Sequence, residues 1–220
     1  MSDEALEAAA RRAVACLDLT DLSEECGEDD VRALAARAET PAGSVAALCV
    51  WPRFVASAKA AAPSDVKVAT VVAFPTGEAR DEDAVAEADR ALRDGADEID
   101  VVIPWRALME GREGEVVSRV ARVKREAGSS VVKAILETGV LEDAAMIRRA
   151  ADLALHGGAD FLKTSTGKAT VNATLSAAEV MLEAIAEAGR PVGFKAAGGI
   201  RTTAEAAAYL ELADARMGEG

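Results

Sequence analysis

The feature that most constrains the fold of this chain is a repeated unit. A short apolar run rich in valine, isoleucine and alanine is followed each time by a polar turn and a stretch with helical spacing. The seven runs lie at residues 13–19, 44–50, 66–73, 98–103, 131–137, 160–163 and 192–195. Runs that are apolar on both faces and alternate with helices predict a parallel sheet covered by helices on both sides. We therefore expect an α/β protein.

The helices between the runs are amphipathic. In residues 81–94, Ala84, Ala88 and Leu92 share one face, charged residues occupy the other, and Gly95 follows as a stop signal. The chain length of 220 residues suits one domain, so we expect residues 1–220 to form a single (β/α) barrel preceded by a short helix at residues 1–12.

Two features favour a barrel over an open, doubly wound sheet, which remains the alternative. Residues 95–100 match residues 158–163 in spacing and character, which places Asp100 and Lys163 at the same height on the fourth and sixth strands. Alternate strands of a barrel supply the same interior layer, so the two side chains are expected to face one cavity. Polar residues also gather where several strands end, the position at which barrels carry their chemistry. They are Asp18, Thr20, Asp100, Lys133, Glu137, Lys163, Thr164 and Lys195.

Charge and cysteine content restrict the partners and the compartment. The formal net charge of -13 disfavours nucleic acid and anionic membrane surfaces, because both would be repelled. No segment approaches the ~20 apolar residues that a membrane span needs. Three widely spaced cysteines, Cys16, Cys26 and Cys49, indicate neither a disulfide framework nor a zinc site. We expect Cys16 and Cys49 to be buried thiols in apolar strands, and a cytoplasmic location.

The segment Phe161-Leu162-Lys163-Thr164-Ser165-Thr166-Gly167-Lys168 is the main candidate for chemistry. A lysine that ends an apolar strand must pair with a buried carboxylate or lose its proton, and a neutral amine is a nucleophile. The polar turn that follows offers hydroxyls and amides able to bind an anion, with Lys168 beside them. A solvent-facing strand end with a polar turn is the simpler alternative, and local composition alone favours it.

A second strand ends in lysine in the same way, at Lys195, and the pair Gly198-Gly199 opens the helix after it. Each ammonium disfavours ionisation of the other, so we expect the pKa of one lysine to be lowered. Metal chemistry is disfavoured because the chain has one histidine, His156, which we assign to a helix end. There is no GxGxxG after the first strand and no GxxxxGK[ST], so neither a metal nor a nucleotide cofactor is expected.

These residues carry a close resemblance to the 2-deoxyribose-5-phosphate aldolase family, Schiff-base enzymes on a TIM (β/α)8 barrel. Its motifs stand here as LDLT at 17–20, CVWPRF at 49–54, FPTG at 74–77, GADEIDVVIPWRAL at 95–108, KAILETGVL at 133–141, FLKTSTGK at 161–168 and GFKAAGGIRT at 193–202. Order and spacing agree from about residue 13 to 210.

The resemblance implies reversible cleavage of 2-deoxy-D-ribose 5-phosphate into acetaldehyde and D-glyceraldehyde 3-phosphate, without a cofactor, by a homodimer. Lys163 is implied as the imine-forming lysine, while Lys195 lowers its pKa and relays protons with Asp100. Asp18, Thr20 and Lys168 are implied to contact substrate hydroxyls and the carbonyl region. The phosphate is implied to lie among Gly167, Lys168, Gly198, Gly199 and Arg201. Lys133, Glu137 and Thr166 complete the expected cavity, with Lys133 and Glu137 on one strand face.

One departure from the family pattern concerns the C-terminus. The family continues past the helix expected at 203–213 into an eighth strand, whereas this sequence ends at Gly220, so we expect the eighth βα unit to be missing. Its loss would leave open edges on the neighbouring strands. The missing unit makes one alternative function possible, a non-catalytic sugar-phosphate-binding barrel fragment. A separate alternative is a Schiff-base aldolase of different substrate, similar to transaldolase.

Overall fold

A computed structural model describes residues 3–218 and contains one seven-stranded parallel sheet. The strands are β1 (Asp18–Asp21), β4 (Ala47–Val50), β5 (Lys67–Val72), β6 (Glu98–Val102), β7 (Val131–Ile135), β8 (Phe161–Lys163) and β9 (Gly193–Lys195). Their order in the sheet is their order in the chain. A small antiparallel hairpin of β2 (Glu39–Thr40) and β3 (Gly43–Ser44) precedes β4.

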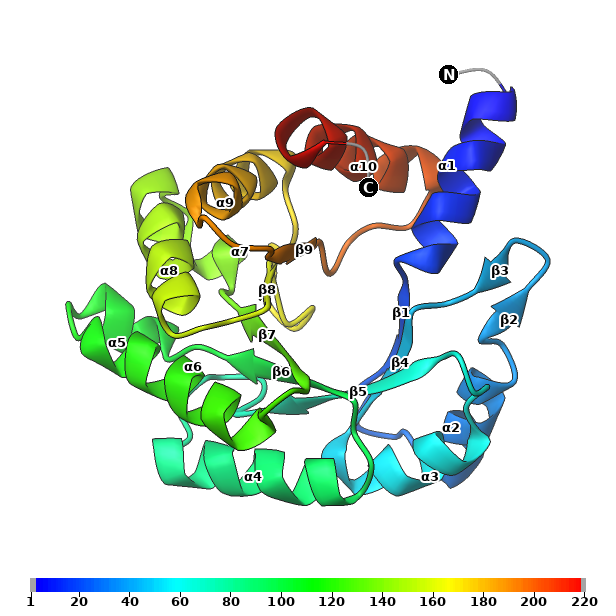
Figure 1. Ribbon diagram of the computed structural model, residues 1–220, viewed down its shortest axis with the longest axis horizontal. Coiled ribbons are helices and arrows are strands. Elements are labelled where there is room, and N and C mark those ends of the chain that lie inside the picture. The colour runs from blue at the N-terminus through cyan, green and yellow to red at the C-terminus, as the bar shows by residue number, and fades with distance from the viewer. Residues whose placement is uncertain (1–2, 219–220) are drawn as a thin grey trace.

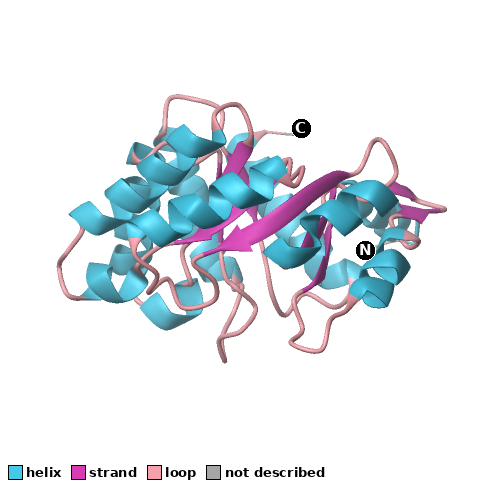
Figure 2. Ribbon diagram, turned by 90° about the horizontal axis from the view of Figure 1, so that it is seen from below, coloured by secondary structure: helices cyan, strands magenta, loops and turns pink. Residues whose placement is uncertain are grey.

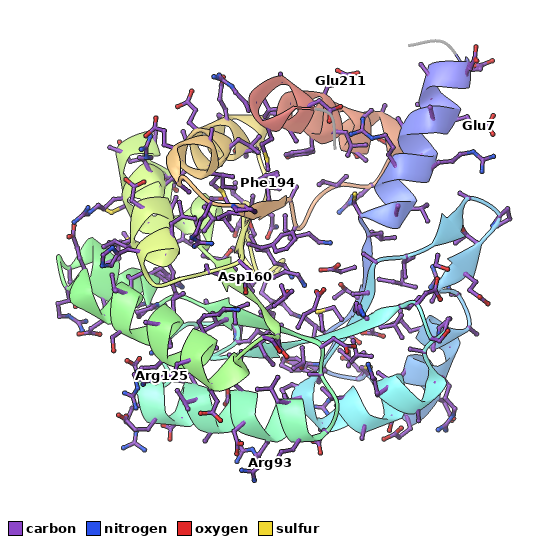
Figure 3. The ribbon with its side chains drawn as sticks, in the orientation of Figure 1. Glu7, Arg93, Arg125, Asp160, Phe194 and Glu211 are labelled. Atoms are coloured by element: carbon purple, nitrogen blue, oxygen red, sulfur yellow. The ribbon has the colours of Figure 1, made fainter. Side chains whose placement is uncertain are left out.

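Helices surround the curved sheet, as Figure 1 shows. They are α1 (Asp3–Ala15), α2 (Glu28–Ala35), α3 (Val55–Ala61), α4 (Asp81–Arg93), α5 (Trp105–Met109), α6 (Gly114–Ala127), α7 (Thr138–Leu141), α8 (Ala144–His156), α9 (Leu175–Glu187) and α10 (Thr203–Met217), with a 3-10 turn η1 (Pro52–Phe54) before α3. The side view in Figure 2 shows the strands enclosed between helices and loops. The charged sides of the helices face outwards, as Arg93, Arg125 and Glu211 illustrate in Figure 3.

Side chains alternate along the strands between the barrel interior and the helix layer. On β4, Cys49 belongs to a small interior cluster with Ala69 and Val71 of β5. Its neighbour Leu48 packs instead into a larger cluster formed with the outer helices. Small side chains dominate the interior cluster, and they leave space for long polar side chains at the carboxyl ends of the strands. The layer between sheet and helices supplies most of the apolar core.

The register of the sheet is that of a barrel. Asp100 of β6 pairs with Lys133 of β7, and Lys133 pairs with Phe161 of β8, so Lys163 lies two residues further along. A stagger of about one residue per strand is what an eight-stranded barrel of shear 8 requires. The predicted meeting of Asp100 and Lys163 in one interior layer therefore holds.

The sheet does not close among the described residues. The outermost strands are β1 and β9, and the helices α1 and α10 pack across the interval between them. Arg12 holds this contact by donating two hydrogen bonds of 2.7 Å to Asp214. We call this interval the seam; a mainly apolar cavity of about 460 Å³ lies in it. The fold class is thus confirmed as α/β, with a TIM-barrel-like sheet that lacks a closing strand.

The structure differs from the sequence-based expectations at several strand boundaries. The run at 44–50 is divided between β3 and β4, and two further differences bear on the site. Residues 13–15 were expected in the first strand but belong to α1, so Cys16 lies at a helix end and is exposed instead of buried. A short apolar run cannot be assigned to helix or strand from its periodicity alone, and here Val14 continues the helix face that packs inwards. The second difference is that β7 ends at Ile135, which leaves Glu137 beyond the strand.

Two further expectations are met. Cys49 is fully buried, and His156 is the last residue of α8. In the part of the chain that the structure describes, no helix is both long and apolar enough to cross a membrane.

Candidate active site

Lys163 is the last residue of β8, and its backbone is held on both sides. The Leu136 N–H donates to the Lys163 carbonyl at 2.9 Å, and the Thr164 N–H donates to the Lys195 carbonyl at 3.0 Å. The side chain is 8% exposed, and its ammonium donates to Asp100 Oδ2 at 2.6 Å. The strand therefore presents one amine, tightly paired, to the barrel interior.

Asp100 begins a series of alternating charges that we call the ladder. Its second oxygen, Oδ1, accepts from Lys133 Nζ at 3.0 Å, and Lys133 also lies 3.2 Å from Asp18 Oδ2. Glu98 is a third partner of Lys133. Asp18 Oδ1 in turn pairs with Lys195 Nζ at 2.6 Å. Three lysines and three carboxylates thus balance each other, with Lys163 and Lys195 at the two ends.

The buried part of the ladder keeps its members charged. Burial by itself raises the pKa of Asp100, but the charges of Lys133 and Lys163 outweigh it and lower the pKa to about 2. Burial lowers the pKa of Lys163, while the charge and the hydrogen bond of Asp100 raise it above its usual value. Burial also lowers the pKa of Lys133, but the charges of its carboxylate partners outweigh burial and hold this pKa well above its usual value. At neutral pH Lys163 therefore rests as an ammonium ion.

This result differs from the sequence argument, which expected Lys195 to lower the pKa of Lys163. The two lysines are register partners on β8 and β9, yet their ammonium groups bind different carboxylates. The lysine whose charge opposes protonation of Lys163 is chiefly Lys133. Lys195 reaches the other way, across the seam, and donates to the Cys16 carbonyl at 2.7 Å.

Lys163 and Lys195 open into a cavity of about 440 Å³ at the carboxyl ends of the strands. Most of the predicted site residues line it: Asp18, Thr20, Lys163, Thr166, Gly167, Lys168, Lys195 and Gly198. Asp100 and Lys133 lie directly behind this wall, buried and in contact with the lining residues. Gly199 and Arg201 are exposed and lie outside the lining, and the Arg201 N–H donates to Glu205 at the start of α10.

The loop after β8 shapes one side of this cavity. Thr164 joins it to the loop after β9, because its hydroxyl donates to the Ala197 carbonyl and accepts from the Ala197 N–H at 2.9 Å. Gly198 adopts φ +84°, and a Cβ there would lie 2.7 Å from Cβ of Asn172, so the two loops pack as closely as glycine allows. Lys168 crosses the mouth and donates to the Leu22 carbonyl at 2.8 Å.

Several residues of the site were not singled out by the sequence argument. Glu98 joins the ladder from the first position of β6, where an acidic residue is expected to face solvent. Leu22, Ser23 and Phe74 line the cavity from the loops after β1 and β5. Phe74 belongs to the FPTG motif and Glu98 to the motif at 95–108, so motif position offered a signal for both; Leu22 and Ser23 carried none. Cys49 lies beneath the cavity, and burial raises the pKa of its thiol to about 11.

The arrangement combines a buried amine with a carboxylate acceptor, further cations, and a loop rich in N–H and hydroxyl groups. An amine next to a general acid–base pair suits carbonyl addition and imine formation. Within residues 3–218, no group of three or more histidine, cysteine, aspartate or glutamate residues is arranged to hold a metal ion.

Comparison with known proteins gives a consistent family. The model of the DeoC/LacD family aldolases matches residues 12–218. The deoxyribose-phosphate aldolase of Agrobacterium fabrum (strain C58 / ATCC 33970) is 50% identical over 212 residues, which are 95% of this chain and 82% of that protein.

Solved structures agree with this family. The apo form of a protein assigned as a deoxyribose-phosphate aldolase in Toxoplasma gondii ME49 superposes with a TM-score of 0.90 at 30% identity, over 98% of this chain and 88% of that one. Deoxyribose phosphate aldolase from Aeropyrum pernix, a tetramer, superposes with a TM-score of 0.77 at 28% identity, covering 96% and 91% of the two chains.

Proposed function

The chain belongs to the DeoC/LacD family of aldolases, and from that premise we propose that it is a deoxyribose-phosphate aldolase, a lyase. It cleaves 2-deoxy-D-ribose 5-phosphate reversibly into acetaldehyde and D-glyceraldehyde 3-phosphate, a step in the breakdown of deoxyribonucleotides. The observation that carries the proposal is the pairing of Lys163 Nζ with Asp100 Oδ2 at 2.6 Å, beside a cavity large enough for a sugar phosphate.

The reaction begins at the aldehyde carbon C1 of the open-chain sugar. Lys163, once deprotonated, adds to C1, and loss of water leaves a protonated imine. The imine accepts the electron pair of the C2–C3 bond as the C3 hydroxyl loses its proton and becomes the aldehyde of glyceraldehyde 3-phosphate. The two carbons left on Lys163 form an enamine, which is protonated at C2 and hydrolysed to acetaldehyde.

These steps need groups that accept and return protons. We assign that role to Asp100 and Lys195, which lie along the ladder on either side of Asp18. Deprotonation of Lys163 is the demanding step, because the charge of Asp100 raises the pKa of this lysine. Lys133 opposes that effect, since its own charge lowers the pKa of Lys163.

Substrate binding is assigned to the polar groups of the cavity. Asp18, Thr20 and Lys133 serve the hydroxyl and carbonyl end, on the side of the ladder. The phosphate end is assigned to the loops after β8 and β9, where N–H groups and cations are available. Thr166, Gly167, Lys168 and Gly198 line the cavity there, and we assign the exposed Gly199 and Arg201, just outside the lining, to the same phosphate end.

Assembly and location follow from the same proposal. We expect a homodimer that works in the cytoplasm. The three cysteines, all free thiols, agree with a reducing compartment.

The test of the proposed function is chemical trapping. The protein is treated with acetaldehyde and sodium borohydride, and its peptides are mapped by mass spectrometry; a stable two-carbon adduct is expected on Lys163. Cleavage of 2-deoxyribose 5-phosphate is followed by coupled reduction of the glyceraldehyde 3-phosphate that is released. A folded protein that forms no adduct and cleaves nothing would be a non-catalytic barrel. Trapping of dihydroxyacetone in place of acetaldehyde would indicate a transaldolase-like enzyme.

A further inference from the structure

Glu137 is a buried acidic residue that has no part in the steps above. It follows the end of β7, only 3% of it is exposed, and it contacts none of the lysines of the ladder. Its backbone is left-handed, with φ 59° and ψ 52°, a conformation that is uncommon for a residue with a side chain. The next residue, Thr138, anchors this turn by donating its N–H to the Thr164 carbonyl at 2.9 Å. The left-handed turn directs the carboxylate towards the loop after β8.

Both oxygens of the Glu137 carboxylate are used by one residue of that loop. Thr166 donates its backbone N–H to Oε1 at 3.2 Å and its hydroxyl to Oε2 at 2.6 Å. The Thr166 hydroxyl also accepts from the Lys168 N–H at 3.0 Å. Glu137 therefore determines the direction of the hydroxyl, and the hydroxyl closes the turn Thr166-Gly167-Lys168.

This turn is the part of the loop that faces the cavity. Thr166, Gly167 and Lys168 all line it, and Gly167 and Lys168 are exposed there. Gly167 has φ +81°, so the turn is built on a residue with wide conformational freedom and requires an external restraint to hold one shape. Among the described residues, hydrogen bonds restrain both ends of the turn: Thr166 donates to Glu137, and Lys168 Nζ donates to the Leu22 carbonyl.

The chemistry of the contact requires a carboxylate. An ionised carboxylate only accepts hydrogen bonds, so it satisfies the N–H and the hydroxyl together. A glutamine of the same size has one accepting oxygen and one donating NH₂ group. Whichever way its amide is turned, either the Thr166 N–H faces another donor or the Thr166 hydroxyl proton loses its acceptor. With its oxygen turned to the Thr166 N–H, the glutamine can still donate its NH₂ group to the Thr166 hydroxyl, so the charge-assisted hydrogen bond of 2.6 Å is replaced by a weaker neutral one that runs in the opposite direction.

We propose that Glu137 is a positioning residue for the phosphate end of the substrate, acting through Thr166 to hold the 166–168 turn in its binding conformation. This inference rests on the proposed function, because the sugar phosphate is the ligand of that function. Glu137 touches neither the reacting atoms nor the phosphate. Its loss should therefore affect binding of the phosphate and not the chemistry at Lys163. The ammonium of Lys163 is held by Asp100, a different carboxylate from the one that holds Thr166.

The experiment compares Glu137→Gln with wild type on two substrates, 2-deoxyribose 5-phosphate and unphosphorylated 2-deoxyribose. We expect KM for the phosphorylated sugar to rise roughly tenfold, because a charge-assisted hydrogen bond is replaced by a neutral one, while kcat changes less than about twofold. For unphosphorylated 2-deoxyribose, kcat/KM is expected to stay within about twofold of wild type, because no phosphate is bound. Glu142→Gln is the matched control, since Glu142 also has positive φ, at the other end of α7, and is exposed.

Each outcome decides the proposal. An unchanged KM for the phosphorylated sugar overturns it, and so does an equal loss of kcat/KM on both sugars, which would indicate a merely structural role. If Glu137→Gln lowers the melting temperature too far for assay, Glu137→Asp replaces it: the shorter carboxylate cannot reach both donors of Thr166, and the same roughly tenfold rise in KM, confined to the phosphorylated sugar, is expected. Failure of wild type to trap acetaldehyde would instead overturn the proposed function.

Discussion

The two ends of the ladder contrast sharply, although each consists of a lysine paired with an aspartate. Lys163 ends β8, which has a paired strand on both sides, and its partner Asp100 is 0% exposed. Lys195 ends β9 beside the seam, and its side chain is 16% exposed. Charges interact more strongly where water is excluded. The barrel interior therefore sets the protonation of Lys163. Lys195 is bound by Asp18 and by the Cys16 carbonyl across the seam, and it is also in contact with solvent.

The largest expected effect is the loss of activity in Lys163→Ala, at the buried end of the ladder. Turnover of 2-deoxyribose 5-phosphate should fall by about 10⁴-fold or more, because Lys163 is the amine assigned to imine formation and the other two lysines of the cavity have other roles and partners, Lys168 at the Leu22 carbonyl and Lys195 at Asp18. Measurement of kcat and of the borohydride adduct by mass spectrometry checks this. Lys67→Ala, which removes an exposed lysine at the start of β5, is the matched control and should behave as wild type. An adduct of undiminished yield in Lys163→Ala would refute the assignment.

Next in size is the stability effect of Asp100→Asn. Removal of one partner from a buried charge network costs about 3–5 kcal/mol of unfolding free energy, because Lys163 would lose its partner and remain buried. Asp214→Asn, which breaks the exposed pair with Arg12, should cost much less, because water screens that pair. Urea denaturation at pH 7 measures both. Equal losses of unfolding free energy in the two variants would mean that burial of the Lys163–Asp100 pair has no energetic consequence.

The same variant has a defined pH dependence. The pKa of Asp100 is lowered from 3.8 to about 2, so its stabilising contribution is present above pH 3.8 and is lost as the pH falls through about 2. The difference in unfolding free energy between wild type and Asp100→Asn should therefore shrink across that interval. A difference that stays constant down to pH 2 would contradict the lowered pKa.

At the other end of the ladder, Lys195→Leu should lower activity strongly and change stability little. We expect kcat to fall about 100-fold through loss of proton transfer, with a change of less than about 1 kcal/mol in unfolding free energy. The stability effect is small because Asp18 keeps Lys133 as its partner, so no carboxylate is left unpaired. Steady-state kinetics and urea denaturation on one preparation test both parts. A loss of stability as large as that of Asp100→Asn would remove the distinction between the two ends.

The pH dependence of trapping reports directly on the surroundings of Lys163. Because the pKa of Lys163 is raised, its neutral fraction grows about tenfold per pH unit, and the rate of adduct formation with acetaldehyde should rise accordingly between about pH 6 and 9. A lowered pKa of Lys163, as expected from the two strand-ending lysines, would instead give a rate that levels off near neutral pH. A plateau below pH 8 would mean that Lys195 approaches Lys163 more closely in solution than the ladder indicates.

Much of the molecule could be predicted from local pattern. The alternation of apolar runs and amphipathic helices determined the parallel sheet, because each run is too apolar to lie on a surface and each helix has one apolar face. The repeat at residues 95–100 and 158–163 predicted that Asp100 and Lys163 would meet, and they lie 2.6 Å apart. Such repeats are informative because every unit of a barrel places equivalent positions at the same end of the sheet.

The tertiary structure alone decided the rest. Which lysine influences Lys163 depends on where each ammonium group finds its carboxylate, and that is set by the stagger of the strands and by the seam beside β9. Glu137 was expected to share a strand face with Lys133, but its left-handed backbone turns it to Thr166. Sequence spacing predicts which side of a regular strand a residue occupies, whereas the end of a strand and the direction of a long side chain depend on contacts between segments distant in the chain.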